Sequence, residues 1–163
     1  MQAGDIGFLS KRGDPIAALI RFAQRHKYGD VPAAHYNHVF MVTDSDGGII
    51  EALPSGVTAG NVSKYAGEDY VIKTPPYAPG EAANAVAAMR ASVGEGYGFL
   101  TFVSVALSLM TGTRLRFGLA GTEICSGDAA DALTRANVDC GPDATFDTPA
   151  DLYALVKWAH GKS

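Results

Sequence analysis

Two kinds of hydrophobic pattern open the chain. Residues 5–9, Asp-Ile-Gly-Phe-Leu, form a short apolar run typical of a β-strand. Apolar positions then recur at intervals of three and four residues, which predicts an amphipathic helix from Pro15 to about His26. Asp14 is the expected N-cap, and Gly29 allows the chain to leave the helix through a left-handed conformation.

A β-hairpin is the clearest β signal in the sequence. Residues 36–43 and 49–53 are strand-like, and residues 44–48, Asp-Ser-Asp-Gly-Gly, are typical of a turn. Both faces of each strand carry large apolar side chains, so we expect the sheet to be covered on both sides, as when helices pack against it. A further strand is expected at residues 70–73.

Beyond Pro79 the pattern becomes helical. We expect helices over residues 81–93, about 123–136 and 149–160, the last with Thr148 as its N-cap. Strands come first and helices follow, without an internal repeat or a linker. This order predicts a single α+β domain in which a small antiparallel sheet packs against helices.

Composition and charge narrow the classes of function. The 163 residues are 47% hydrophobic and 18% charged, as in ordinary globular proteins. The net charge of −4 and the lack of a clustered Lys/Arg footprint argue against a nucleic-acid partner. The longest apolar run, residues 98–110, is shorter than the roughly 20 residues that span a membrane, so it predicts a buried helix and no transmembrane anchor.

The first residues, Met-Gln-Ala-Gly-Asp, do not lead from a basic region into an apolar stretch. No secretory signal is therefore expected, and the default location is the cytoplasm. Delivery by a phage or export by a non-Sec route stays open, and so does the oligomeric state.

Cys125 is the strongest candidate nucleophile. Small and polar residues precede it and a helical pattern follows, which places it at or near a helix N-terminus. Free N–H groups at such a position favour the thiolate and are able to stabilise an oxyanion. The alternative is a small buried side chain. Cys140 lies in a predicted loop and is interpreted as structural, and a disulfide between the two cysteines stays open.

A cysteine nucleophile needs a base, and His38 is the best candidate because it lies within a predicted strand. His26 and His160 each fall near a helix C-terminus, which favours an ordinary surface role. His35 and His38 are three residues apart, so on a strand they point to opposite faces and do not form a metal pair. We expect no metal and no cofactor.

Glu51 is the expected orienting group for His38, because a carboxylate inside an apolar strand needs a partner. A hairpin loop of either two or four residues places both side chains on the same face. With the four-residue loop, Phe40 pairs with Glu51 and His38 lies one diagonal step away, within side-chain reach. The alternative is that backbone donors or an Arg satisfy Glu51.

These features occur in a recognisable order. Gly4-Asp5-Ile6 comes first, then His38-Val39-Phe40-Met41-Val42, then Ile49-Ile50-Glu51-Ala52, and finally Ile124-Cys125-Ser126 opening a helix. In this order the chain resembles the circularly permuted NlpC/P60 papain-like enzymes, particularly the YiiX/YebB-like branch, in which the His and acidic strands precede the cysteine helix. The resemblance covers roughly residues 4–133.

The resemblance implies a papain-like fold and a cysteine peptidase or amidase. Cys125 would be the nucleophile, His38 the base and Glu51 the orienting residue, and the expected substrates are peptides or muropeptides derived from peptidoglycan. Two alternatives stay open. One is a hydrolase or acyltransferase acting on lipid or thioester acyl groups, and the other is a non-catalytic binding or assembly module, for instance in a phage particle.

Overall fold

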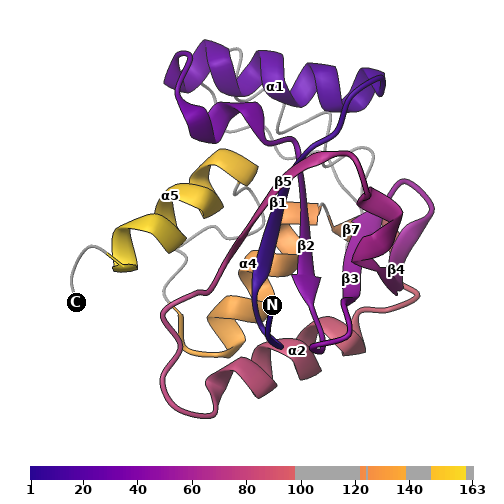
Figure 1. The fold of residues 1–163 in the computed structure, drawn as a ribbon, viewed down its shortest axis with the longest axis vertical. Helices are drawn as coiled ribbons and strands as arrows, with labels where there is room; N and C mark the ends of the chain where they lie inside the picture. Colours follow the sequence, from indigo (N-terminus) through magenta and orange to yellow (C-terminus); the bar gives the residue numbers. More distant parts are fainter. Residues whose placement is uncertain (98–121, 124, 139–147, 161–163) are drawn as a thin grey trace.

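A five-stranded antiparallel sheet forms the centre of the protein (Figure 1). The computed structural model describes residues 1–97, 122–123, 125–138 and 148–160. Within the sheet the strands lie in the order β4-β3-β2-β1-β5, so the predicted hairpin occupies its middle. The strands are β1 (Ile6–Ser10), β2 (His38–Val42), β3 (Gly48–Leu53), β4 (Gly56–Asn61) and β5 (Asp69–Lys73).

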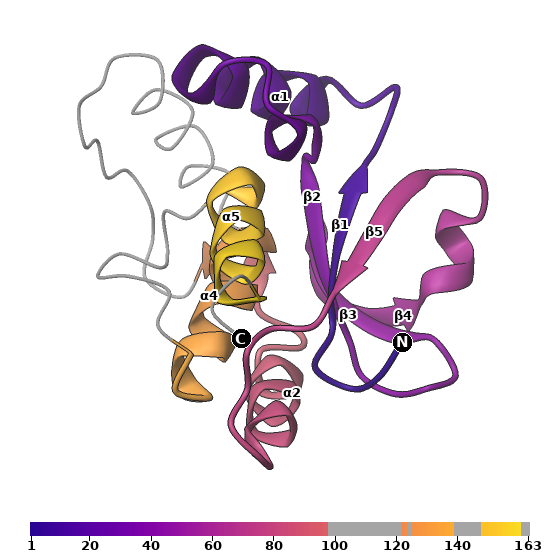
Figure 2. The same cartoon turned by 60° about the vertical axis from the view of Figure 1, so that its left-hand side comes forward.

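Helices cover one side of this sheet and one of its ends. In Figures 1 and 2, α2, α4 and α5 lie on one side of the sheet, and α1 crosses its end. The other side carries a short 3-10 helix, η2, between β4 and β5. The helical elements are α1 (Pro15–Tyr28), η1 (Pro32–His35), η2 (Val62–Tyr65), α2 (Glu81–Ala91), α4 (Cys125–Arg135) and α5 (Pro149–His160).

The predicted class, α+β with a small antiparallel sheet against helices, is confirmed. The helices over residues 81–93, 123–136 and 149–160 appear as α2, α4 and α5 with small shifts at their ends. At α5, the Thr148 hydroxyl accepts from Asp151 N at 3.2 Å while the Asp151 carboxylate accepts from Thr148 N at 3.1 Å, so the predicted N-cap is also confirmed. No helix in the described ranges is both long and apolar enough to cross a membrane.

Two apolar clusters, one on each face of the sheet, explain why both faces of the hairpin are hydrophobic. On the helix-covered face, Val39, Met41 and Ile50 pack with side chains from α2, α4 and α5. On the opposite face, Phe40 and its neighbours pack against η2. The members of this second cluster are Leu9, Phe40, Val42, Ile49, Val62 and Tyr65, with Tyr70 and Ile72 half-buried beside them.

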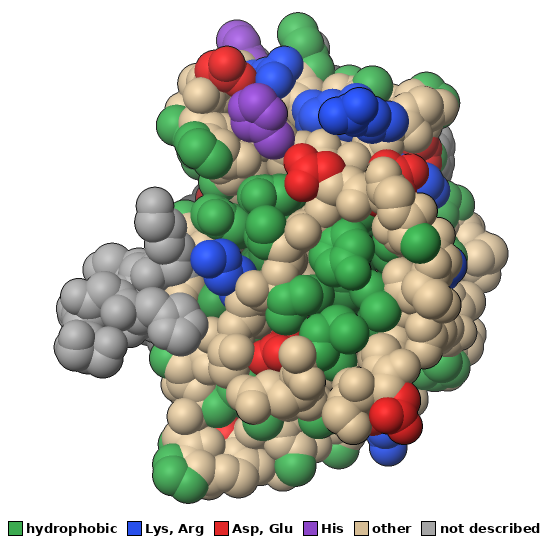
Figure 3. Space-filling model, in the orientation of Figure 1, with side chains coloured by type: hydrophobic (Ala, Val, Ile, Leu, Met, Phe, Trp, Pro, Cys, Tyr) green, Lys and Arg blue, Asp and Glu red, His purple; other side chains and the backbone are tan. Residues whose placement is uncertain are grey.

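The expectation that the sheet is covered on both sides is confirmed, but among the described residues α-helices pack on one face only. A single 3-10 turn with two buried side chains, Val62 and Tyr65, covers the second face instead. Figure 3 shows that hydrophobic side chains remain visible in the middle of the molecule in this view, below an end that carries Lys, Arg, His and acidic side chains.

Helix α1 has the predicted ends but buries a smaller apolar face than its pattern indicates. Asp14 Oδ1 accepts from Ile16 N at 2.8 Å, and Gly29 has a φ of 76°, so both caps form as expected. Leu19, however, is 39% exposed, and the buried residues are Ala17, Ala23 and Gln24. The helix lies across the end of the sheet.

Strand β4 was not predicted, and neither was the two-stranded parallel sheet of β6 (Gly96–Tyr97) and β7 (Thr122–Glu123). The sequence of β4, Gly-Val-Thr-Ala-Gly-Asn, has no alternation of large apolar residues. Its outer edge is covered by the chain leading into β6, because Val57 N donates to Glu95 O at 2.9 Å. The predicted buried helix over residues 98–110 lies outside the described residues.

Gln24 joins three elements although glutamine side chains are mostly exposed in proteins. Its Nε2 donates to Tyr36 O at 2.7 Å and to Ala34 O at 3.3 Å, and its Oε1 accepts from Ala150 N at 2.8 Å. The side chain is fully buried. The amide thus connects α1 to η1 and to the first turn of α5.

We predict that Gln24→Leu lowers the free energy of unfolding by about 2–4 kcal/mol, because it leaves Ala150 N and the two carbonyls buried without their partner. Urea titration followed by circular dichroism measures the effect. Gln2→Leu, at an exposed position, is the matched control and should change stability by less than about 0.5 kcal/mol. Equal effects of the two substitutions would contradict this role for Gln24.

Candidate active site

The register of the β2–β3 hairpin places the candidate site. Met41 pairs with Ile50 and Val42 with Ile49. Thr43 N donates to Gly48 O at 2.8 Å, which closes a four-residue turn over residues 44–47. The four-residue alternative is therefore confirmed and the two-residue alternative is wrong.

The turn is fixed by Asp44. One carboxylate oxygen of Asp44 accepts from Asp46 N at 3.0 Å and from Gly48 N at 2.8 Å. These bonds, the one from Gly48 foremost, lower the pKa of Asp44 although the group is exposed. Turn chemistry of this kind sets the register, and the register decides which side chains share a face.

His38 and Glu51 come together as predicted. His38 is the first residue of β2, and Glu51 lies near the end of β3, beyond the paired residues next to the turn. The distance from His38 Nε2 to Glu51 Oε2 is 2.6 Å. Glu51 is completely buried and His38 is 8% exposed, so the pair is shielded from water.

Two further residues, both from η2, contact the Glu51 carboxylate. The Tyr65 hydroxyl donates to Oε2, and Lys64 Nζ forms an ion pair with Oε1. The sequence predicts neither residue as a partner of Glu51. The alternative to His38, that backbone donors or an Arg satisfy the carboxylate, is wrong. Asn61 was the available signal: its side chain accepts from Ser63 N at 2.9 Å and starts the turn that carries Lys64 and Tyr65.

The carboxylate of Glu51 is held as an anion. Burial acts to raise its pKa, but the hydrogen bond and charge of His38, together with the bonds from Lys64 and Tyr65, outweigh burial and lower the pKa to about 2. Because an ionised carboxylate only accepts hydrogen bonds, Nε2 of His38 is the donor in this pair. In its neutral form His38 then carries its acceptor at Nδ1, the nitrogen that the bond to Glu51 does not use.

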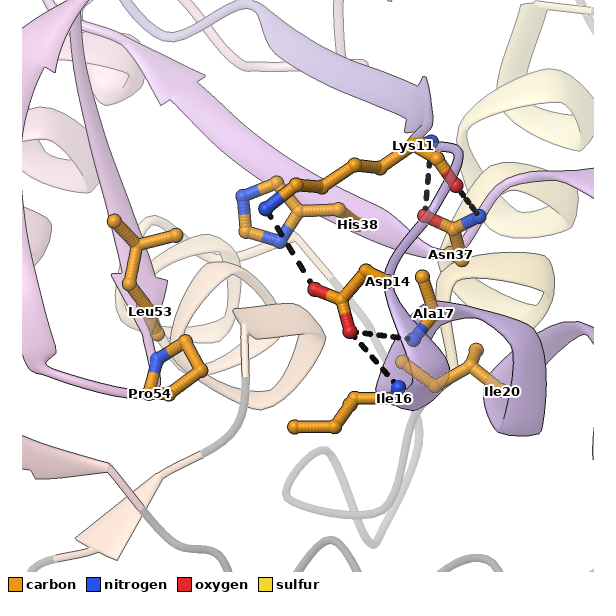
Figure 4. A pocket seen from close by; sticks show the side chains of 10 residues that line it. Lys11, Asp14, Ile16, Ala17, Ile20, Asn37, His38, Leu53 and Pro54 are labelled. Carbon is orange, nitrogen blue, oxygen red and sulfur yellow. Dashed lines mark hydrogen bonds and ion pairs between the residues drawn. The ribbon is translucent and has the colours of Figure 1, made fainter.

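A small pocket lies beside His38 (Figure 4). The start of α1 contributes Ile16, Ala17 and Ile20 to its wall, and the end of β3 contributes Leu53 and Pro54. Figure 4 shows the His38 ring between these two sides, with Lys11 and Asp14 at the mouth. Lys11 Nζ lies 3.6 Å from Asp14 Oδ2.

Cys125 is the first residue of α4, as the prediction of a helix N-terminus requires. Helix α4 contacts both β2 and β3, the strands that carry His38 and Glu51. In Figures 1 and 2 its later turns lie near α2, so its first turn points toward the end of the sheet where β2 begins. The position of the Cys125 side chain lies outside what the structure describes.

The remaining candidates are separate from this site or lie outside the described residues. His35 Nε2 is 3.1 Å from Asp30 Oδ1, in an exposed pair beside α1. His26 is exposed in the last turn of α1. Cys140 lies in the undescribed range 139–147. Among the described side chains, no three of the His, Cys, Asp and Glu type gather as a metal site would require.

No protein-family model matches the chain, and no curated protein matches it in sequence. The resemblance to NlpC/P60 enzymes thus depends on the order of its motifs alone and stays a prediction. What the geometry contributes independently is a buried, ionised carboxylate that fixes the orientation of an imidazole beside a pocket. Such a pair is suited to proton transfer in nucleophilic catalysis.

The lowered pKa of Glu51 predicts a pH dependence of stability. The folded protein favours the ionised form, so this contribution is complete above pH 4.5 and is lost as the pH falls toward 2. We expect the stability difference between the wild type and Glu51→Gln to shrink by about 2 kcal/mol between pH 6 and pH 2.5. Urea unfolding at a series of pH values measures it.

Glu95→Gln is the matched control, because Glu95 is exposed. Its stability difference from the wild type should stay nearly constant over the same range. If the Glu51→Gln difference is equally constant, Glu51 is not held as a stabilised anion.

Proposed function

We propose that the protein is a cysteine hydrolase that cleaves amide bonds through Cys125, His38 and Glu51. The observation that carries the proposal is the buried contact of 2.6 Å between His38 Nε2 and an ionised Glu51. Further support comes from α4, which begins at Cys125 and packs on the strands that hold this pair.

In the proposed reaction, His38 Nδ1 takes the proton of the Cys125 thiol. The sulfur attacks the carbonyl carbon of the amide and forms a tetrahedral oxyanion, which backbone N–H groups at the start of α4 stabilise. His38 then gives the proton to the leaving nitrogen, and the C–N bond breaks to leave a thioester. His38 next removes a proton from water, whose oxygen attacks the thioester, and the same proton returns to sulfur as the acid leaves.

Glu51 contributes by orientation and charge rather than by taking the proton. Its carboxylate fixes the imidazole through Nε2 and stabilises the imidazolium that forms when Nδ1 is protonated. With its pKa at about 2, the carboxylate stays ionised throughout the neutral pH range. Helix α4 adds the partial positive charge of its first turn, which favours the thiolate at Cys125.

The substrate class follows from the motif order rather than from the pocket. The resemblance favours peptides or muropeptides derived from peptidoglycan. The apolar wall formed by Ile16, Ile20, Leu53 and Pro54 favours a second candidate, hydrolysis or transfer of an acyl group from a lipid or thioester by the same three residues. Turnover of a muropeptide panel, compared with a panel of acyl esters and thioesters, distinguishes the two.

We predict that Cys125→Ala abolishes turnover of every substrate in both panels. In the wild type, iodoacetamide should alkylate Cys125 near neutral pH, as measured by mass spectrometry of the peptide that contains it. Cys140→Ala is the matched control and should retain both turnover and alkylation of Cys125. Activity that survives in Cys125→Ala would end the proposal, and an unreactive Cys125 in an inactive wild type would favour a binding or assembly module.

The pocket beside His38 generates a separate prediction. Leu53→Trp should fill the space between α1 and the end of β3 and thereby raise KM at least tenfold, because the substrate loses its binding surface. Alkylation of Cys125 by iodoacetamide, which is much smaller, should change less than about twofold. A loss of alkylation equal to the loss of turnover would show that the substitution disturbs the nucleophile rather than substrate binding.

A further inference from the structure

Helix η2 lies over the face of the sheet that carries His38 and Glu51, and the centroid of its Tyr65 ring is 6.2 Å from that of His38. Lys64 reaches Oε1 and Tyr65 reaches Oε2, the oxygen that also contacts His38. Glu51 is completely buried, whereas the Lys64 side chain is 38% exposed. Lys64 therefore brings its charge from the surface to an anion that water does not reach.

We infer that Lys64 and Tyr65 are positioning residues, which hold the Glu51 carboxylate so that His38 donates through Nε2 and presents Nδ1. This inference deepens the proposed function and rests on it for one step, namely that Nδ1 serves Cys125. The orientation of His38 itself is a property of the four side chains and is measurable without any reaction.

A carboxylate that is hydrogen-bonded to His38 alone would not hold the imidazole ring in one orientation as firmly. A buried anion is costly, and with His38 as its single partner Glu51 would keep one buried oxygen without a donor. Donors on both oxygens remove that cost and stop the carboxylate from rotating. The negative charge that His38 meets is then reduced by the Lys64 ammonium, so the neutral imidazole stays accessible as a base.

The two η2 residues are themselves held in place. The ring of Tyr65 stacks on Phe40, with centroids 5.7 Å apart and an interplanar angle of 20°. Lys64 Nζ lies 5.1 Å from the centroid of the Tyr65 ring. Asn61 caps the turn through Ser63 N. The contacts of Lys64 and Tyr65 with Glu51 are therefore part of the packing on this face of the sheet.

The charged groups around His38 define what each substitution should do. Glu51 faces it from β3, Lys64 and Tyr65 from η2, and Lys11 and Asp14 from the mouth of the pocket. Lys11 and Asp14 pair with each other, so their charges largely offset at His38. Removing the Lys64 ammonium or the Tyr65 hydroxyl strengthens the pull of Glu51 on the imidazolium, which raises the pH at which His38 loses its proton.

The test uses nitrogen-15 NMR of the histidine rings in the full chain. All variants carry Cys125→Ser, so that titration of the thiol does not enter, and His38→Gln identifies the His38 signals among the four histidines. In the parent protein the neutral His38 ring should show the Nε2–H tautomer. We expect Lys64→Met and Tyr65→Phe each to raise the titration midpoint of His38 by about 0.5–1 pH unit.

Two further variants act as controls. Lys64→Arg keeps the positive charge and should restore a midpoint close to that of the parent. Lys73→Met removes a lysine whose Nζ also lies over an aromatic ring, 5.7 Å from the Tyr153 centroid but away from Glu51, and should leave the midpoint unchanged. Tyr65→Phe keeps the ring and its stacking, so it carries the test if Lys64→Met fails to fold.

The inference is overturned if Lys64→Met and Tyr65→Phe titrate like Lys73→Met, or if the neutral parent shows the Nδ1–H tautomer. These outcomes are separate from a failure of the proposed function. An inactive wild type with an unreactive Cys125 would refute the hydrolase, while shifted midpoints in the Cys125→Ser variants would still establish that Lys64 and Tyr65 position His38.

Discussion

The buried carboxylate of Glu51 is the constraint on which the arrangement of this site depends. An anion in the middle of a β-sheet is stable only if its oxygens are paired, and the partners of Glu51 come from two other parts of the chain. The four-residue turn at Asp44 supplies the first partner by setting the register that brings His38 within 2.6 Å. The capped turn at Asn61 supplies the other two.

The fold makes this pairing possible by covering the two faces of the sheet differently. Three helices bury one face under an extensive apolar cluster. In the described part of the chain the other face is covered by one 3-10 turn, which is short enough to place Lys64 beside a buried carboxylate while its side chain still reaches solvent.

The sequence predicts those parts of the site that local periodicity and turn chemistry control. The period of two along each strand places His38 and Glu51 on one face, and Asp14, Gly29 and Thr148 mark helix ends through their capping chemistry. Lys64 and Tyr65 escaped prediction because β4 lacks an alternating pattern, so nothing local indicates where η2 lies. Gln24 escaped because its partners are backbone groups that only the tertiary fold brings near.

The different elements that cover the two faces of the sheet also restrict where the proposed chemistry takes place. Glu51 meets its η2 partners on one face, whereas α4 packs on the other, so the sheet itself separates the carboxylate from the cysteine helix. His38 is the first residue of β2 and lies at the end of the sheet, where its ring lines a pocket together with residues from α1 and β3. An imidazole at this end is able to contact a carboxylate on one face and a group approaching from the other. A histidine two residues further along β2, at the position of Phe40, would lie inside the second apolar cluster and be able to contact Glu51 alone.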